Sequence, residues 1–197
     1  MSLLSTLALA MGSSWVSGIN LYAAVATLGL LGRFAGLRLP GDLGVVTNWW
    51  VIGVALGLYV VEFFADKVPL IDSVWDAVHT FIRVPAGAVI AAATFGDFDK
   101  GVQAIAFLIG GGLAFSSHGT KATARAAINT SPEPASNIVA SLAEDVVAIG
   151  AIVLAWLFPI AVIVLVVLAV IVSILLVPRI IRYLRTVRAR LGKLAGG

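Results

Sequence analysis

Cysteine is absent from this chain of 197 residues, which excludes disulfide bonds and thiolate metal sites and leaves the redox compartment of the protein open. Charge is also scarce. Lysine, arginine, aspartate and glutamate together make up 12% of the residues, whereas about a quarter is usual in soluble proteins. Hydrophobic residues make up 60%, and the mean hydropathy is +1.07. This composition excludes an ordinary soluble globular domain.

The longest apolar run is PIAVIVLVVLAVIVSILLV, residues 159–177, which holds one serine and no charge. A helix of about 20 such residues crosses the roughly 30 Å hydrocarbon core of a bilayer. We therefore expect an all-α integral membrane protein, with the lipid bilayer as a partner. The length allows a single domain, residues 1–197, built as a bundle of about six transmembrane or re-entrant helices with proline-broken polar segments.

Six helical segments follow from the apolar runs and the turn signals between them: 13–36, 46–65, 72–95, 101–117, 137–157 and 160–187. Asp72 or Ser73 is expected to cap the third segment, and Pro85 is expected to interrupt it. Residues 118–136 are expected to form a polar connection before the fifth segment. Whether residues 2–12 form an interfacial or a re-entrant helix stays open.

Basic residues gather at the end of the chain, where residues 179–197 hold six of the thirteen lysines and arginines and no acid. By the positive-inside rule, this predicts a multi-pass membrane protein with a basic cytoplasmic tail. An anchor on anionic headgroups is the simpler role of this tail, and nucleic-acid binding is not expected. Lys121 and Arg125 agree with this orientation, whereas Arg33 and Arg38 would lie outside.

Ionisable side chains gather in EFFADKVPLIDSVWDAVHTFIR, residues 62–83. The candidate pathway residues in it are Glu62, Asp66, Lys67, Asp72, Asp76, His79 and Arg83. The last four follow helical spacing and form one stripe, and the first two form an i, i+4 pair. A charge near the bilayer centre costs about 2.5–3.5 kcal/mol on insertion scales, so the stripe requires partners or water.

A second polar region, NTSPEPASNIVASLAED, covers residues 129–145. Two prolines separated by one residue prevent a regular helix at its start, and a membrane tolerates such backbone only where it is buried in protein or lines water. Its candidate pathway residues are Asn129, Glu133, Asn137, Glu144 and Asp145. We expect the stripe of the third segment to face the fifth segment, with Arg83 neutralised by Asp76, Glu144 or Asp145.

Simpler interpretations of these residues remain open. Residues 62–72 suit a loop in water, Arg83 suits a structural ion pair, and His79 suits a packed, hydrogen-bonded histidine. A metal site is a further alternative, because Asp72, Asp76 and His79 with an upstream acid offer the carboxylates and imidazole that manganese, iron or zinc accept. A divalent metal is therefore the one cofactor that these residues suggest.

The blocks SGINLYAAV, EFFADKVPLIDSVWDAVHTFIR and NTSPEPASNIVASLAEDV resemble the bacterial membrane family described as domain of unknown function 4126, over residues 12–185. The resemblance implies a small multi-spanning protein of a bacterial inner membrane and brings no activity with it. It places the following residues in the motif of the family without giving any of them a role: Gly18, Asn20, Glu62, Asp66, Lys67, Asp72, Asp76, His79, Arg83, Asn129, Glu133, Asn137, Glu144 and Asp145.

The leading hypothesis for function is a small transporter or channel for an ion or a small charged solute, with a pathway lined by segments 72–95 and 137–157. The alternatives are a non-catalytic membrane assembly subunit and, less expected, a metal-dependent membrane enzyme acting on lipid phosphates. Asp76 and His79 lie three residues apart, so they are expected to share a proton. A chain of this size is expected to work as a homo-oligomer, most simply a dimer.

Overall fold

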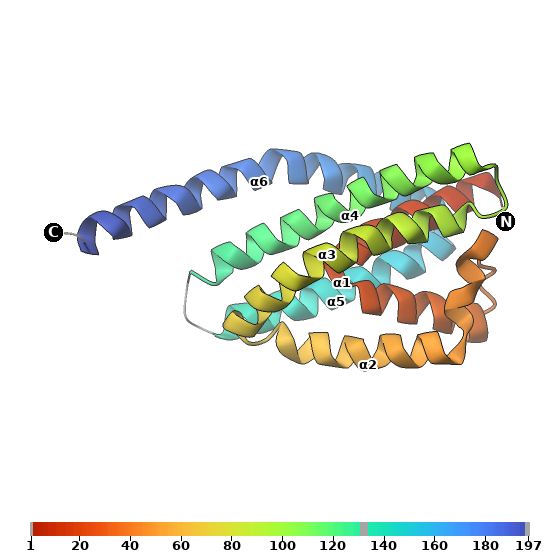
Figure 1. The fold of residues 1–197 in the computed structure, drawn as a ribbon, viewed down its shortest axis with the longest axis horizontal. Coiled ribbons are helices and arrows are strands. Elements are labelled where there is room, and N and C mark those ends of the chain that lie inside the picture. Colours follow the sequence, from red (N-terminus) through yellow and green to blue (C-terminus); the bar gives the residue numbers. More distant parts are fainter. Residues whose placement is uncertain (1, 131–133, 196–197) are drawn as a thin grey trace.

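The computed structural model describes residues 2–130 and 134–195, and this part of the chain is all-helical (Figure 1). Its elements are α1 (Leu3–Phe34), the 3-10 helix η1 (Gly41–Thr47), α2 (Trp49–Ala65), α3 (Pro69–Thr94), α4 (Lys100–Ile128), α5 (Pro134–Leu157) and α6 (Pro159–Ala195). The prediction of an all-α membrane bundle is confirmed.

The exterior of the bundle is apolar. Five helices, α1, α3, α4, α5 and α6, are long and apolar enough to cross a membrane, and η1 with α2 forms a sixth such segment bent by 70°. Large apolar side chains point outward from several of them, including Phe81 and Trp50, each 83% exposed, and Leu108 at 73%. Such a surface suits lipid and not water, so the chain is a multi-pass membrane protein.

Helix α1 is broken at Asn20, whose backbone leaves the helical region with φ −146° and ψ 95°. Both ends of α1 lie near Arg38. Leu3, at the start of the helix, lines the same recess as Arg38, and Phe34, at its end, precedes Arg38 by only a few residues. A straight helix of this length would hold its ends about 47 Å apart. The two halves of α1 therefore fold back on each other, with Asn20 inside the bundle.

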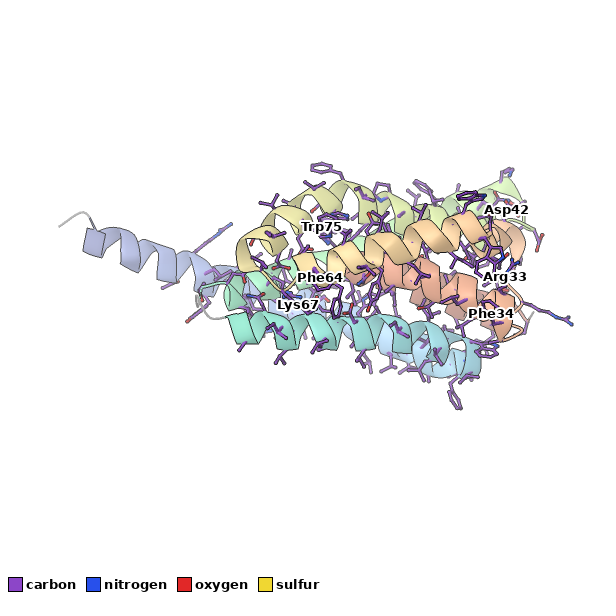
Figure 2. The ribbon with its side chains drawn as sticks, turned by 90° about the horizontal axis from the view of Figure 1, so that it is seen from below. Arg33, Phe34, Asp42, Phe64, Lys67 and Trp75 are labelled. Atoms are coloured by element: carbon purple, nitrogen blue, oxygen red, sulfur yellow. The ribbon has the colours of Figure 1, made fainter. Side chains whose placement is uncertain are left out.

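Both ends of α1 consequently lie at one end of the bundle, together with η1 and the turn between α3 and α4; we call this the η1 end. Figure 2 shows Arg33, Phe34 and Asp42 gathered there, away from Lys67. The opposite end carries the α2–α3 turn and the connection from α4 to α5, and we call it the α2–α3 end. The C-terminal part of α6 extends beyond it (Figure 1).

Helix α1 forms the centre of the bundle and contacts every other helix. Helices α3 and α4 make the most extensive helix–helix contact, α2 packs on α1 and barely touches α3, and α6 lies against α4 and α1. The apolar core joins Leu9, Val16 and Leu28 of α1 to Ile152 of α5 and Val162 of α6. Because α1 is enclosed in this way, its break lies among protein groups.

The first predicted segment, 13–36, is wrong as a single span, because α1 begins at Leu3 and turns back at Asn20. Residues 2–12, whose structure was left open, belong almost entirely to the first half of α1. The polar connection predicted over 118–136 is helical as far as Ile128, which makes α4 a long helix. A helix whose polar face is buried in a bundle has the local composition of a loop, which explains this error.

Two details of α3 also differ from the predictions. Asp72 is not a cap, because the N-cap is Val68 and Asp72 lies in the first turn of the helix. Pro85 does not interrupt α3, which continues through it. Serine hydroxyls of α1 donate to carbonyls on either side of the proline: Ser14 to Gly87 at 2.9 Å and Ser17 to Arg83 at 3.4 Å.

The fold of α1 predicts a specific membrane topology. In oriented vesicles of single-cysteine variants, Ser2→Cys and Arg38→Cys should react with a membrane-impermeant maleimide from the same side, and Thr130→Cys from the other. The absence of native cysteine makes every signal specific. Labelling of Ser2→Cys and Arg38→Cys from opposite sides would show that α1 crosses the membrane once and would contradict the fold.

Candidate functional site

Buried polar side chains from five helices meet in the half of the bundle nearest the α2–α3 end. We call this cluster the polar network. It comprises Asn20 of α1; Glu62 of α2 and Asp66 directly after it; Asp72, Asp76 and Arg83 of α3; His118, Lys121 and Arg125 of α4; and Asn137, Glu144 and Asp145 of α5. All are buried except Glu144, whose side chain is 18% exposed. The apolar exterior therefore encloses a charged centre.

Lys121 is the hub of the polar network. Its Nζ lies 2.9 Å from Asp66 Oδ2, 3.3 Å from Glu144 Oε2, 3.6 Å from Asp76 Oδ1 and 3.9 Å from Glu62 Oε1. The ammonium also donates to the backbone carbonyl of Ile19 at 3.3 Å. One cation thus joins α2, α3, α5 and the break of α1.

Arg83 is fully buried and holds two acids on different helices. Its NH2 donates to Glu62 Oε1 at 2.9 Å, and its NH1 donates to Asp76 Oδ1 at 2.8 Å. Charge-assisted bonds of this length are strong, and each partner would be costly to leave alone in an apolar surrounding. Glu62 and Asp76 are therefore shared between Arg83 and the more distant Lys121.

Arg125 closes the polar network toward the α2–α3 end. Its Nε and NH2 donate to the two carboxylate oxygens of Glu144 at 2.9 and 2.7 Å, a two-point contact that fixes the orientation of both groups. Its NH1 donates to Asn137 Oδ1 at 2.8 Å, and Asn137 donates in turn to Asn129 Oδ1 at 2.7 Å. Asn129 reaches Asp72 Oδ2 at 3.3 Å, so amides link α3, α4 and α5 at this end.

The break in α1 is held by the same network. Asn20 Oδ1 accepts the backbone N–H of Ala23 at 2.9 Å, so this side chain caps the second half of α1. Its Nδ2 donates to Asp145 Oδ1 at 3.0 Å, which places an acid at the N-terminal end of that half-helix, where the helix dipole favours negative charge. The carbonyl of Ile19, at the end of the first half, meets the ammonium of Lys121.

The two histidines have different bonding. His118 Nδ1 lies 3.3 Å from Arg83 NH1, and its Nε2 lies 2.7 Å from Thr80 Oγ1. Arginine only donates, so Nδ1 accepts, Nε2–H donates, and His118 is neutral in this arrangement. His79 Nδ1 donates to the carbonyl of Trp75 at 2.8 Å, its Nε2 bonds the Tyr22 hydroxyl at 3.0 Å, and its ring stacks on that of Trp75.

Acids outnumber cations in and beside the polar network. Six carboxylates, those of Glu62, Asp66, Asp72, Asp76, Glu144 and Asp145, face the three buried cations Arg83, Lys121 and Arg125 and, at the edge, Lys67. If all six carboxylates were ionised and both histidines neutral, the four cations would leave two negative charges uncompensated among the described residues. Five of the six acids have an oxygen without a hydrogen-bond partner in this part of the chain: Glu62, Asp66, Asp72, Asp76 and Asp145.

Lys67 lies in the turn between α2 and α3, where its Nζ donates to the carbonyl of Phe63 at 2.7 Å and sits over the Phe63 ring. It also lies 3.4 Å from Ser141 Oγ of α5. Burial lowers the pKa of the Lys67 ammonium from its ordinary value, and the nearby acids Asp145 and Asp66 oppose that shift. Lys67 therefore borders the polar network and is not one of its buried members.

The structure brings most of the predicted pathway residues together. His79 stands beside the polar network, and Glu133 lies outside the described residues. The stripe of α3 faces inward, but the expectation that it packs on the fifth segment is wrong, because α3 packs on α4. Of the three acids expected for Arg83, only Asp76 binds it; its second partner is Glu62.

The structure does not show the direct sharing of a proton expected between His79 and Asp76. Both ring nitrogens of His79 are already bonded, to Trp75 and to Tyr22, and Asp76 Oδ1 faces Arg83. The i, i+3 spacing placed the two side chains on one face of α3. It did not reveal that a tyrosine on α1 and an arginine one turn further along would take their bonding atoms.

The cations of α4 were not among the predicted site residues. Lys121 and Arg125 had been assigned to a loop, and His118 and Tyr22 had not been considered. The signal was present in their spacing, because His118, Lys121 and Arg125 stand at i, i+3 and i+7 and therefore share one helix face. Asn20 was quoted only for the family resemblance, although an amide within an apolar run can indicate a break in a helix.

The metal alternative gains no support from the geometry. Within residues 2–130 and 134–195, no group of three histidine, aspartate or glutamate side chains is placed to hold a metal ion. The candidates Asp72, Asp76 and His79 point to separate partners, namely Asn129, Arg83 and Tyr22.

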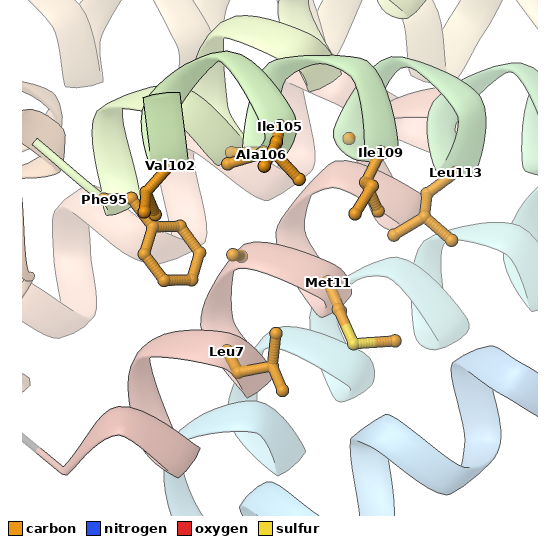
Figure 3. A pocket seen from close by; sticks show the side chains of 11 residues that line it. Leu7, Met11, Phe95, Val102, Ile105, Ala106, Ile109 and Leu113 are labelled. Carbon is orange, nitrogen blue, oxygen red and sulfur yellow. The ribbon is translucent and has the colours of Figure 1, made fainter. Parts of the chain in front are cut away.

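Two cavities flank the helices away from the charged residues. Figure 3 shows one of about 180 Å³ near the η1 end, lined by apolar residues such as Leu7, Met11 and Phe95. Another, of about 490 Å³, lies between α1, α2 and α3 and includes Tyr22 in an otherwise apolar lining. A recess of about 220 Å³ between α3 and α4 differs from both, because Asp76 and Arg125 line it.

Comparison with known families gives a match to the model for Domain of unknown function (DUF4126) over residues 7–179. The chain belongs to this family. The match covers α1 through most of α6, so the polar network lies wholly within the DUF4126 region. No curated protein and no solved structure matches the chain.

Proposed function

We propose that this DUF4126 protein is a small membrane transporter for an ion or a small charged solute, with a pathway that passes through the polar network. One observation carries the proposal: α1 is broken at Asn20 inside the bundle, and both half-helix ends meet ionisable side chains. Transporter folds build ion and substrate sites from such broken helices, because the half-helix ends supply backbone dipoles in the membrane interior.

The charge balance supports a cationic species in the pathway. With all six acids ionised, two carboxylates would lack a compensating cation, and the nearby cations would not offset the cost of removing them from water. Binding of a proton or a small cation removes this free-energy cost, and the cost returns when the ion leaves. The polar network therefore has the property that a pathway site needs, a charge state that depends on its occupant.

The packing toward the η1 end favours a transporter over an open channel. There α1, α3 and α4 approach so closely that a Cβ on Gly87 would lie 2.5 Å from Ala114 Cβ and 2.6 Å from Ser17 Oγ. A continuous pore through this seam is excluded in this conformation, so transport requires the helices to move.

We also propose that the α2–α3 end faces the cytoplasm, because the basic tail leaves the bundle there. The homo-oligomer expected from the chain length stays a prediction.

Ion flux into liposomes tests the proposal. Gradients of protons, alkali cations and divalent cations are imposed in turn on liposomes that contain the purified protein. The flux of each ion is followed with an internal dye that reports that ion. We expect a flux well above that of protein-free liposomes, and we expect Asp76→Asn to reduce it at least tenfold. Asp99→Asn is the matched control, because Asp99 is an exposed N-cap and asparagine caps equally well.

Two results would count against transport. The first is a wild-type flux no higher than that of empty liposomes for every ion tested. The second is an equal flux from wild type and Asp76→Asn, with both shown to be folded by circular dichroism and size-exclusion chromatography. Either result would favour the assembly-subunit alternative, in which the ion pairs only fix the packing of the helices.

A further inference from the structure

The recess between α3 and α4 reaches the polar network from the side. It has a volume of about 220 Å³. It is lined by Ser73, Asp76, Ala77 and Thr80 of α3 and by Ala122, Arg125 and Ala126 of α4. Five of these seven side chains are alanine, serine or threonine. A water molecule takes about 30 Å³ of liquid volume, so the recess has room for several.

Asp76, one of the residues that line this recess, has a carboxylate oxygen without a hydrogen-bond partner among the described residues. Asp76 is 5% exposed, and its Oδ1 accepts from Arg83 at 2.8 Å. Its Oδ2 is buried and has no hydrogen-bond partner among the described residues. Buried carboxylate oxygens are normally hydrogen-bonded, so Oδ2 of this lining residue keeps lone pairs that can accept a proton.

The position of the recess suits an entrance. Ser73 lies in the second turn of α3 near the α2–α3 end, and Thr80 lies about 10 Å further along the helix axis. The recess therefore extends from near the end of the bundle toward its interior. At its inner end, Thr80 Oγ1 bonds His118 Nε2 at 2.7 Å and donates to the carbonyl of Asp76 at 3.0 Å.

We propose that this recess is the water-filled entrance by which protons reach the polar network, and that Asp76 Oδ2 receives them. A hydronium ion in the recess transfers its proton to Oδ2, an O–H bond forms there, and a water molecule remains. The protonated carboxyl then carries no charge, and the negative excess of the network falls by one. This inference rests on the proposed function, because it names the ion and the entrance of that pathway.

The charges around Asp76 select a proton over a metal cation. The titratable groups around it are Arg83, Asp72 and His79 on α3, His118, Lys121 and Arg125 on α4, Glu62 on α2 and, through Lys121, Glu144 on α5. A metal cation beside Asp76 would lie close to two guanidinium groups and an ammonium. These cations also lower the affinity of Asp76 for a proton, but a proton carries one charge and needs one lone pair, whereas a divalent metal ion carries two charges and needs several oxygen ligands.

Cysteine accessibility tests the entrance without any measurement of flux. The chain has no cysteine, so Ala77→Cys and Ala122→Cys place single thiols in the recess. In proteoliposomes, we expect both to react with a charged, membrane-impermeant methanethiosulfonate at least tenfold faster than Val78→Cys. Val78 is the matched control, because it is the next residue on α3 and is 55% exposed on the apolar exterior. Equal rates would show that lipid fills the recess and would overturn the proposal.

Infrared spectroscopy tests Asp76 as the proton acceptor. Acidification of wild-type proteoliposomes should produce a carboxylic acid band that shifts rapidly when the water is exchanged for D₂O, and Asp76→Asn should lack that band. Persistence of the same band in Asp76→Asn would overturn the assignment. Fast labelling together with the band, but without ion flux, would support the entrance and contradict transport. Flux with slow labelling would contradict the entrance alone.

Discussion

Replacing Lys121 with methionine is expected to destabilise the folded bundle by about 3–5 kcal/mol, because buried acids lose their shared cation. Methionine is unbranched and flexible and fills most of the same space, so the loss is one of charge and not of packing. Asp66, which lies 2.9 Å from Lys121 Nζ, would keep only Arg125, at 3.7 Å, as an ion-pair partner among the described residues. Thermal unfolding in detergent, followed by helical circular dichroism, measures the effect.

Two further variants make this experiment specific to the polar network. Lys100→Met is the matched control, because Lys100 is exposed and bonds Gln103 at 3.0 Å, and its melting temperature should stay close to that of the wild type. Adding Asp66→Asn to Lys121→Met should recover part of the lost stability, since the most closely paired acid is then neutral. If the two single lysine variants melted alike, Lys121 would not be the hub of a buried ion cluster.

The parts of the fold that are local in sequence could be predicted. The apolar run of α6 fits the length of a membrane span, and the spacing of Asp72, Asp76 and Arg83 fixes one face of α3 whatever surrounds it. The stripe was therefore assigned correctly to the interior. Its partners could not be assigned in the same way, because a helix face does not indicate which helix packs against it.

The break in α1 illustrates a second limit. Residues 13–36 are apolar and close to the length of one span, and hydropathy is the same for a straight helix and for one that turns back. No proline marks the turn, and Asn20 is the residue that leaves the helical region. What decides the geometry is the set of distant partners, Asp145 for the asparagine side chain and Lys121 for the freed carbonyl of Ile19.

The assignment of α4 failed for a related reason. The segment around Lys121 and Arg125 has the polarity of a loop, and its charges were used as evidence for membrane orientation. Burial reverses that interpretation, because both side chains are almost fully enclosed by acids of α2, α3 and α5. Counting charges of opposite sign across the whole bundle, and not segment by segment, would have shown that the acids of α3 and α5 need cations from a third helix.

Replacing Gly18 with alanine is expected to displace the broken helix from α4. A Cβ at this position would lie 2.0 Å from Ser117 Oγ and 2.2 Å from the backbone carbonyl of Ala114. The serine side chain can rotate, but the carbonyl belongs to the α4 backbone and cannot yield without moving the helix. Overpacking of this kind costs about 1–3 kcal/mol or more, so the melting temperature should fall clearly.

The same substitution should also disturb the polar network, because the helix seam at Gly18 carries one of its contacts and a serine bond beside it. Displacing α1 lengthens the bond from Ser117 Oγ to the carbonyl of Trp15, now 2.6 Å, and the bond from Lys121 Nζ to the carbonyl of Ile19, now 3.3 Å. Loss of stability and loss of ion flux are therefore expected together.

Gly112→Ala is the matched control for Gly18→Ala, since a Cβ on Gly112 of α4 meets nothing within 4 Å. Its melting temperature should be unchanged or slightly higher, because alanine favours the helix over glycine by about 0.5–1 kcal/mol. Adding Ser117→Ala to Gly18→Ala should restore little, because the contact with the Ala114 carbonyl remains. Full recovery in that double variant would mean that the serine side chain, and not the approach of the two backbones, sets the packing of α1 on α4.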